Sequence, residues 1–178
     1  MNKLVVFSLL GGDLNHGFPV VTAQLWDVDQ PYPVKFTGSL PAVPELPELY
    51  RRWQLLYEAL HQRLGWHWRI KVYSQDVTNV SVSEFGDVCQ QLQSYINRWL
   101  NSEPFQNIVQ QLRTLLSPDD EIRVIIETNV ALLHRLPWHL WNFFEDYSNA
   151  EVALSTQYLR PQVLPRAPTG PVKLLMLF

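Results

Sequence analysis

The sequence predicts an α/β fold, with strand-like segments towards both ends of the chain and helices between them. Residues 4–10 and 18–26 are rich in Val, Leu and Phe and flank a turn that contains glycine and asparagine, a pattern typical of a β-hairpin. Between residues 46 and 116, apolar residues recur at the three-and-four spacing of helices. After residue 119, short β-branched and apolar runs alternate with a helical segment, as in a sheet of parallel strands.

The composition is that of a folded protein suited to a reducing compartment. Of the 178 residues, 47% are hydrophobic and 17% are charged, which favours a packed core over disorder. The net charge is −3 and the basic residues are scattered, so we expect no nucleic-acid partner. The single cysteine, Cys89, cannot form an internal disulfide, and no apolar run approaches the roughly 20 residues of a membrane helix. We therefore expect a cytoplasmic protein with no membrane partner.

The N-terminal hairpin is followed by a proline-rich connector. Residues 27–47 contain five prolines, and proline has no backbone donor for a sheet or a helix interior. This stretch therefore predicts an extended connector with one short strand at residues 34–36.

Three segments then carry one apolar face each and predict three consecutive helices. Pro47 suits the first turn of the first helix, and Gly65 suits its end. Residues 68–73 predict a short strand, Ser81 or Ser83 is expected to cap the second helix, and Pro104 to open the third. The three apolar faces comprise Leu46, Leu49, Tyr50, Trp53, Leu56, Tyr57, Leu60 and Leu64; Phe85, Val88, Leu92, Tyr95, Ile96 and Trp99; and Phe105, Ile108, Val109, Leu112, Leu115 and Leu116.

The C-terminal third predicts a new set of strands. Residues 121–128 form a β-branched run with little alternation, which is typical of a strand covered on both faces. A short helical segment at 136–144 and a second strand at 151–155 follow. Residues 160–171 contain four prolines and predict a linker, and residues 173–178 resume a strand pattern.

We therefore divide the chain into a hairpin-plus-helices region at residues 1–118 and the start of an α/β domain at residues 119–178. An uncharged apolar strand at the end of the sequence needs neighbours on its faces, so we expect the fold to continue past residue 178. The alternative is that residues 173–178 pair as the last strand of this domain.

Three consecutive features resemble the opening of a CHAT domain, a caspase-like α/β fold. They are the strand Ile122-Arg123-Val124-Ile125-Ile126, the segment Leu136-Pro137-Trp138-His139-Leu140-Trp141, and the strand Glu151-Val152-Ala153-Leu154-Ser155. Residues 173–178 are similar to the next strand of that family, and residues 1–117 look like the N-terminal region of CHAT proteins of the cyanobacterial type. One departure is His139, because the position after Pro-Trp is often acidic in the family.

The resemblance implies a caspase-like cysteine peptidase whose catalytic His and Cys follow later strands, beyond residue 178. This chain would then be the non-catalytic N-terminal part, and its partner would be the remainder of the same polypeptide or another protein. The alternative is a non-catalytic interaction or signalling scaffold with a pseudo-caspase platform, because a fold does not fix a function. We assign no catalytic, cofactor-binding or metal-binding residue within the chain.

Individual candidates for chemistry all have a simpler structural interpretation. His16 and Cys89 do not match the caspase spacing, and Cys89 falls in the middle of a predicted helix. The pairs His134 with His139 and His61 with His67 are separated by Pro137 and Gly65, respectively, which argues against a metal pair on one helix. We expect the acidic run at residues 119–121 to be a solvated turn, and the pair at residues 11–12 lacks the lysine of a phosphate loop.

Aromatic residues are dense in two places, around Trp66 and Trp68 and between Trp138 and Phe144. A ligand platform is one interpretation of such density. Core packing is the interpretation we prefer, since Trp138 and Trp141 are three residues apart and lie near one face of a helix.

Overall fold

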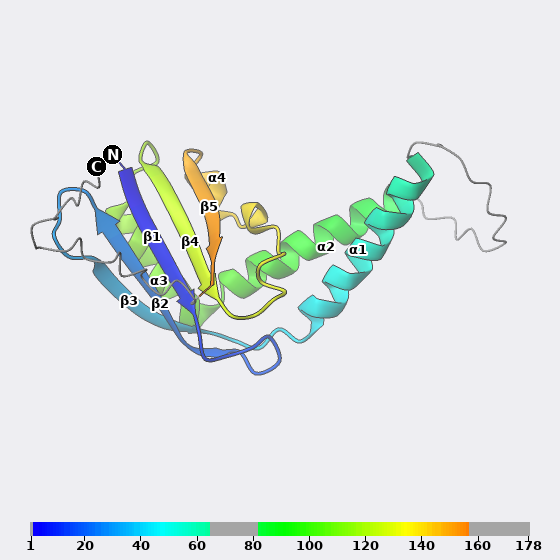
Figure 1. The fold of residues 1–178 in the computed structure, drawn as a ribbon, viewed down its shortest axis with the longest axis horizontal. Helices are drawn as coiled ribbons and strands as arrows, with labels where there is room; N and C mark the ends of the chain where they lie inside the picture. The colour runs from blue at the N-terminus through cyan, green and yellow to red at the C-terminus, as the bar shows by residue number, and fades with distance from the viewer. Residues whose placement is uncertain (1, 65–81, 157–178) are drawn as a thin grey trace, which may run out of the picture.

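A computed structural model describes residues 2–64 and 82–156 of the chain (Figure 1). It confirms the N-terminal hairpin, formed by β1 (Asn2–Leu9) and β2 (Phe18–Asp27). The strand expected at residues 34–36 is longer, because β3 (Val34–Leu40) continues past Gly38 and pairs with β2. The strands expected at residues 68–73 and 173–178, and the linker at residues 160–171, lie outside the described residues.

The three predicted helices are α1 (Glu45–Leu64), α2 (Val82–Leu100) and α3 (Glu103–Leu115). Each begins with an acidic residue in its first turn, where a carboxylate complements the positive end of the helix dipole. In α3, Pro104 occupies the first turn, where its missing N–H leaves no helical hydrogen bond unmade. The predicted elements of the C-terminal third are also present: β4 (Glu121–Thr128), the 3₁₀ turn η1 (Trp138–Leu140), the short α4 (Phe143–Asp146) and β5 (Ala150–Ser155).

All five strands belong to one mixed sheet with the order β3-β2-β1-β4-β5. The β1–β2 and β2–β3 pairs are antiparallel, whereas β1, β4 and β5 run parallel to one another. β4 lies beside β1 along its whole length, from the Asn2–Glu121 pair to the Leu9–Thr128 pair. Strands from both sides of residue 118 therefore share one sheet and one core.

The core lies on the face of the sheet that the helices cover, behind the strands in Figure 1. α3 packs on β3 and β2, and it approaches so closely that a Cβ on Gly38 would lie 2.7 Å from the Pro104 carbonyl oxygen. The buried apolar side chains of the sheet on this face are Val5, Phe7, Leu9, Phe18, Val21, Ala23, Leu25, Phe36, Leu40, Ile122, Val124 and Ile126.

The expectation that β4 is covered on both faces differs from the described structure. Ile122, Val124 and Ile126 are buried, but Arg123 points to the opposite face and is exposed, while Ile125 on that face is half-buried. The sequence did not predict that buried and exposed side chains alternate along β4, because positions 124 to 126 are all apolar. Arg123 was the residue that indicated an exposed face. Within residues 2–64 and 82–156, α3 is the helix that packs directly on the strands, and it lies on the other face. We call the face that carries Arg123 the open face.

The antiparallel pair of α1 and α2 extends away from the sheet (Figure 1). α1 buries Leu46 and Leu56, while the rings of Tyr50, Trp53 and Tyr57 form a partly exposed ladder with centroids 5.5 Å apart at each step. Within the part of the chain that the structure describes, no helix has both the length and the apolar character to cross a membrane.

Candidate functional site

A groove of about 920 Å³ lies at the edge of the sheet where β1, β4 and β5 begin and β2 ends. Its walls come from the turn after β2 on one side and from the turn before β5 on the other. The residues that line it are Asn2, Lys3, Leu4, Trp26, Asp27, Val28, Glu121, Ile122, Arg123, Ile125, Ser148, Asn149, Ala150 and Glu151. Segments far apart in the sequence thus form a single hollow.

The strand register places a row of side chains across the floor of this groove. Leu4 pairs with Trp26 on β2 and with Arg123 on β4, and Arg123 pairs in turn with Glu151 on β5. Ile125 follows Arg123 on the same face of β4. Leu4 and Ile125 are half-buried and Trp26 is 40% exposed, so the floor has an accessible apolar part beside Arg123 and Glu151.

The rim of the groove is charged, and its carboxylates outnumber its cations. Glu121 precedes Arg123 by two residues on β4, and Glu151 faces Arg123 across the β4–β5 pair. All three are exposed, and the described part of the structure shows no ion pair that involves any of them. Among the described residues these carboxylates form no ion pair, so a ligand that reaches the rim can contact them beside Arg123.

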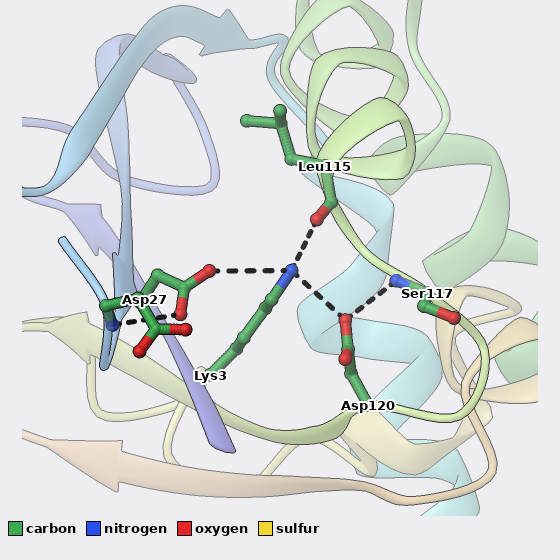
Figure 2. Close-up of polar contacts among 6 residues, drawn as sticks. Lys3, Asp27, Leu115, Ser117 and Asp120 are labelled. Carbon is green, nitrogen blue, oxygen red and sulfur yellow. Dashed lines mark hydrogen bonds and ion pairs between the residues drawn. The ribbon is translucent and has the colours of Figure 1, made fainter. Parts of the chain in front are cut away.

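Lys3, which lines one end of the groove, contacts the C-terminal end of α3 (Figure 2). Its Nζ donates a hydrogen bond of 2.6 Å to the Leu115 carbonyl oxygen at the end of α3. The same nitrogen lies 3.2 Å from an Asp120 carboxylate oxygen and 3.8 Å from one of Asp27. A cation at the C-terminus of a helix is favoured by the helix dipole, so Lys3 joins β1, β2 and the turn from α3 to β4.

Asp120 is the buried partner in this network, with a side chain only 8% exposed. The Ser117 backbone N–H donates to its Oδ2 at 2.8 Å, and this bond, with the nearby Lys3, lowers the pKa of Asp120 below 3.8 despite the opposing effect of burial. The sequence predicted a solvated turn at residues 119–121, but the Asp120 side chain in this turn is buried. The acidic pattern indicated a turn, but the partner of Asp120 comes from the other end of the sequence.

The structure does not bring His16 and Cys89 together in a dyad. His16 lies in the β1–β2 turn, where its Nδ1 is 2.9 Å from the Asp13 carboxylate, and a hydrogen bond to that ring lowers the pKa of Asp13. Cys89 lies in the middle of α2 and is partly buried. The two residues thus have the structural positions that the sequence indicated.

His134 and His139 are not among the residues that line the groove. His134 Nε2 is 2.9 Å from the Thr128 carbonyl oxygen, and His139 is exposed in η1. His67 and the His61 side chain lie outside what the structure describes. Among the described residues, no three His, Cys, Asp or Glu side chains are grouped so that they could hold a metal ion.

The aromatic segment near Pro137 is core, as predicted. Trp138 and Trp141 are 3% and 1% exposed, and the Trp138 Nε1 donates to the Leu133 carbonyl oxygen at 2.8 Å. The Trp141 ring stacks on Phe143 with a centroid distance of 4.8 Å. Trp66 and Trp68 lie outside the described ranges, so the interpretation of that pair remains a prediction.

Comparison of the chain with protein-family models, with curated proteins and with solved structures finds no match. The groove itself combines an apolar floor, one exposed indole and an acidic rim, which are features of a binding surface. Sequence reasoning missed the residues that form it. The signal was weak but present, because Glu121 and Arg123 occupy alternate positions in an apolar strand and so mark one face as polar.

Proposed function

We propose that this chain is the N-terminal, non-catalytic part of a CHAT-domain protein, a caspase-like cysteine peptidase whose His/Cys dyad would lie beyond residue 178. The arrangement that supports the proposal is the parallel β4–β5 pair, joined through the Pro137-Trp138 segment, with β1 parallel to β4. The resemblance rests on the same order of strand, Pro-Trp segment and strand. In this proposal the chain contributes the first strands of the sheet and the helices that cover it.

The placement of the candidate residues agrees with a chain that carries no chemistry of its own. Cys89 sits on a helix beside Val88, which is fully buried, so it has the surroundings of a packing thiol. Among the described residues, His16 and His134 have partners in Asp13 and in a backbone carbonyl, respectively. A catalytic thiol needs a base within hydrogen-bond reach, and neither of these rings is shown beside Cys89.

The test begins with the gene. The reading frame should continue past the codon for Phe178 and encode a His after one strand and a Cys after a later strand. The protein from that longer frame should cleave a panel of fluorogenic peptides, and the 178-residue chain should not. Substituting Cys89→Ala in the longer protein should leave cleavage unchanged. A frame that ends at Phe178, or a folded Cys89→Ala variant that loses cleavage, would overturn the proposal.

A non-catalytic interaction scaffold is the second candidate, and the groove favours it. An accessible apolar floor beside Glu121 and Glu151, which form no ion pair within the described residues, is suited to recognition of another polypeptide segment. A reading frame that continues without the His and Cys would support this function over the peptidase.

A further inference from the structure

The groove on the open face needs a ligand that is both apolar and basic. Among the described residues, its lining and the adjacent Asp120 contribute four carboxylates, those of Asp27, Asp120, Glu121 and Glu151, against the two cations Lys3 and Arg123, and the charge of the amino terminus also acts on Asp120. Lys3 is already held by two of these carboxylates. The excess of negative charge therefore lies at Glu121 and Glu151, with Arg123 between them. A cationic side chain that approaches this rim gains favourable charge interactions, whereas an acidic one is repelled.

We propose that the proline-rich segment at residues 160–171 of this same chain docks in the groove. The segment lies outside the described residues, and its sequence contains Arg160, Arg166, four prolines and no acidic residue. Its charge is thus opposite to that of the rim. Val163 and Leu164 supply aliphatic side chains for the floor beside Leu4 and Ile125.

The chemistry of proline suits a site on the face of a sheet. β1, β2 and β4 each have a hydrogen-bonded neighbour on both sides in the sheet, so the open face over them offers side chains rather than free N–H and C=O groups. A segment rich in proline has fewer N–H groups to satisfy and keeps an extended shape without internal hydrogen bonds. Proline rings pack well on aromatic side chains, and Trp26 is the exposed aromatic side chain in the lining.

The length of the chain allows the segment to reach the site. From Glu151 at the groove to Thr156, where the described residues end, the chain advances five residues, or about 17 Å along a strand. Arg166 lies ten residues beyond Thr156, which corresponds to about 31 Å in an extended proline-rich conformation. The segment can therefore turn back and place Arg166 beside Glu121 or Glu151. Covalent attachment gives it an effective concentration of the order of millimolar, which favours it over a second copy of the chain.

A cysteine pair tests the docking in the full 178-residue chain. In a Cys89→Ser background, the groove position receives Ser148→Cys and the segment receives Ala167→Cys. Mild copper-catalysed oxidation by dissolved oxygen should then form a disulfide within one molecule, at a rate independent of protein concentration. The control pairs Ala167→Cys with Gln106→Cys, which is exposed on α3 on the helix-covered side of the sheet. We expect the groove pair to cross-link at least about tenfold faster than this control.

Charge reversal provides an independent measurement in the same background. Arg166→Glu should slow the cross-linking at Ser148→Cys about tenfold at low ionic strength, and 0.5 M salt should reduce the difference because the charges are screened. Lys35→Glu is the matched control, since Lys35 is an exposed cation on β3 outside the groove, and it should leave the rate unchanged. Equal rates for the groove pair and the Gln106 pair would overturn the proposal. Cross-linking only between two molecules would also overturn it and would assign the groove to a second copy.

Discussion

At the scale of single residues, the contacts of Lys3 with Asp120 show how side chains from opposite ends of the sequence fix the start of the sheet. Lys3 is the second residue of β1, and Asp120 directly precedes β4, the strand that lies beside β1. A polar group left without its partner in a buried position costs far more than the pair contributes in net terms. The same contacts hold one wall of the groove, because Lys3 and Asp27 line it.

We predict that Asp120→Ala lowers the free energy of unfolding by about 2 kcal/mol at neutral pH. The substitution leaves the Ser117 N–H without its acceptor and removes the closest carboxylate from Lys3. Urea denaturation followed by circular dichroism measures the change. Asp119→Ala is the matched control, since Asp119 is exposed next to it, and it should change stability by less than about 0.5 kcal/mol. Equal changes in the free energy of unfolding for the two substitutions would show that the contacts of Asp120 with Lys3 and Ser117 do not stabilise the fold.

The same carboxylate predicts a pH dependence with a defined sign. The pKa of Asp120 is lower in the folded protein than its ordinary 3.8, chiefly because the Ser117 N–H bonds to the ionised form. As pH falls, the unfolded chain therefore binds the proton first. The stabilisation by Asp120 is complete above pH 3.8 and is lost as pH falls through the folded pKa. The difference in unfolding free energy between the wild type and Asp120→Ala should accordingly shrink in melts below that pH.

Trp138 is a buried aromatic residue of η1 whose truncation should be costly. It is 3% exposed, and its indole N–H is bonded to the Leu133 carbonyl oxygen. We predict that Trp138→Ala destabilises by about 3 kcal/mol, the cost of a cavity left by a buried aromatic ring. Trp138→Phe retains much of the volume but removes the hydrogen bond, so it should cost less. A near-zero change for Trp138→Ala in denaturant melts would contradict the buried position.

At the scale of elements, two glycines allow a test of how closely α3 lies on the sheet. Gly38 in β3 faces α3, and a Cβ there would meet both the Pro104 oxygen and the Ile108 side chain at 3.0 Å or less. We predict that Gly38→Ala destabilises by about 2 kcal/mol, because α3 or β3 must move. Gly86 in α2 is the control, since a Cβ at Gly86 meets nothing within 4 Å.

Gly86→Ala should instead stabilise the protein by about 1 kcal/mol, the difference in helix propensity between the two residues. Thermal melts of both variants measure the pair of effects under one condition. A destabilising Gly86→Ala would mean that α2 does not continue through this position. A neutral Gly38→Ala would mean that the layers are farther apart than the structure places them.

The helices and strands could be predicted from the sequence because their signals are local. The spacing of Val88, Leu92 and Ile96 defines the face of α2 without knowledge of what covers it. β3 was underestimated because prolines surround it and because its pairing with β2 extends through Gly38, a poor strand former on its own. The β-propensity of the residues alone therefore predicts a strand that is too short, whereas hydrogen bonding to the neighbouring strand β2 extends it.

At the scale of the whole molecule, the groove could not be predicted because it depends on strand order. Trp26, Arg123 and Glu151 come together only when β1 lies between β2 and β4, an arrangement that no local pattern encodes. The sequence signalled the acidic turn at residues 119–121 but not its contact with Lys3, more than a hundred residues away. Contacts between residues so far apart in the sequence depend on the order of the strands in the whole sheet.

The same strand order predicts that residues on the two sides of position 118 unfold together. β1 is hydrogen-bonded to β2 on one edge and to β4 on the other, so its loss from either pair would expose a central strand. Val5 and Val124, neighbours across the β1–β4 pair, are both fully buried. A single cooperative transition should therefore govern the described sheet.

Amide hydrogen exchange of the full chain measures this directly. The slowest amides of β1 and β4 should exchange with one common opening free energy, and tryptophan fluorescence and far-ultraviolet circular dichroism should give the same denaturation midpoint. A fragment of residues 1–118 should fail to give a native-like melt, because β1 would become an edge strand whose buried apolar face has lost Val124 and Ile126. Two separate transitions, or a stably folded fragment, would instead show that the boundary after residue 118 divides independent domains despite the shared sheet.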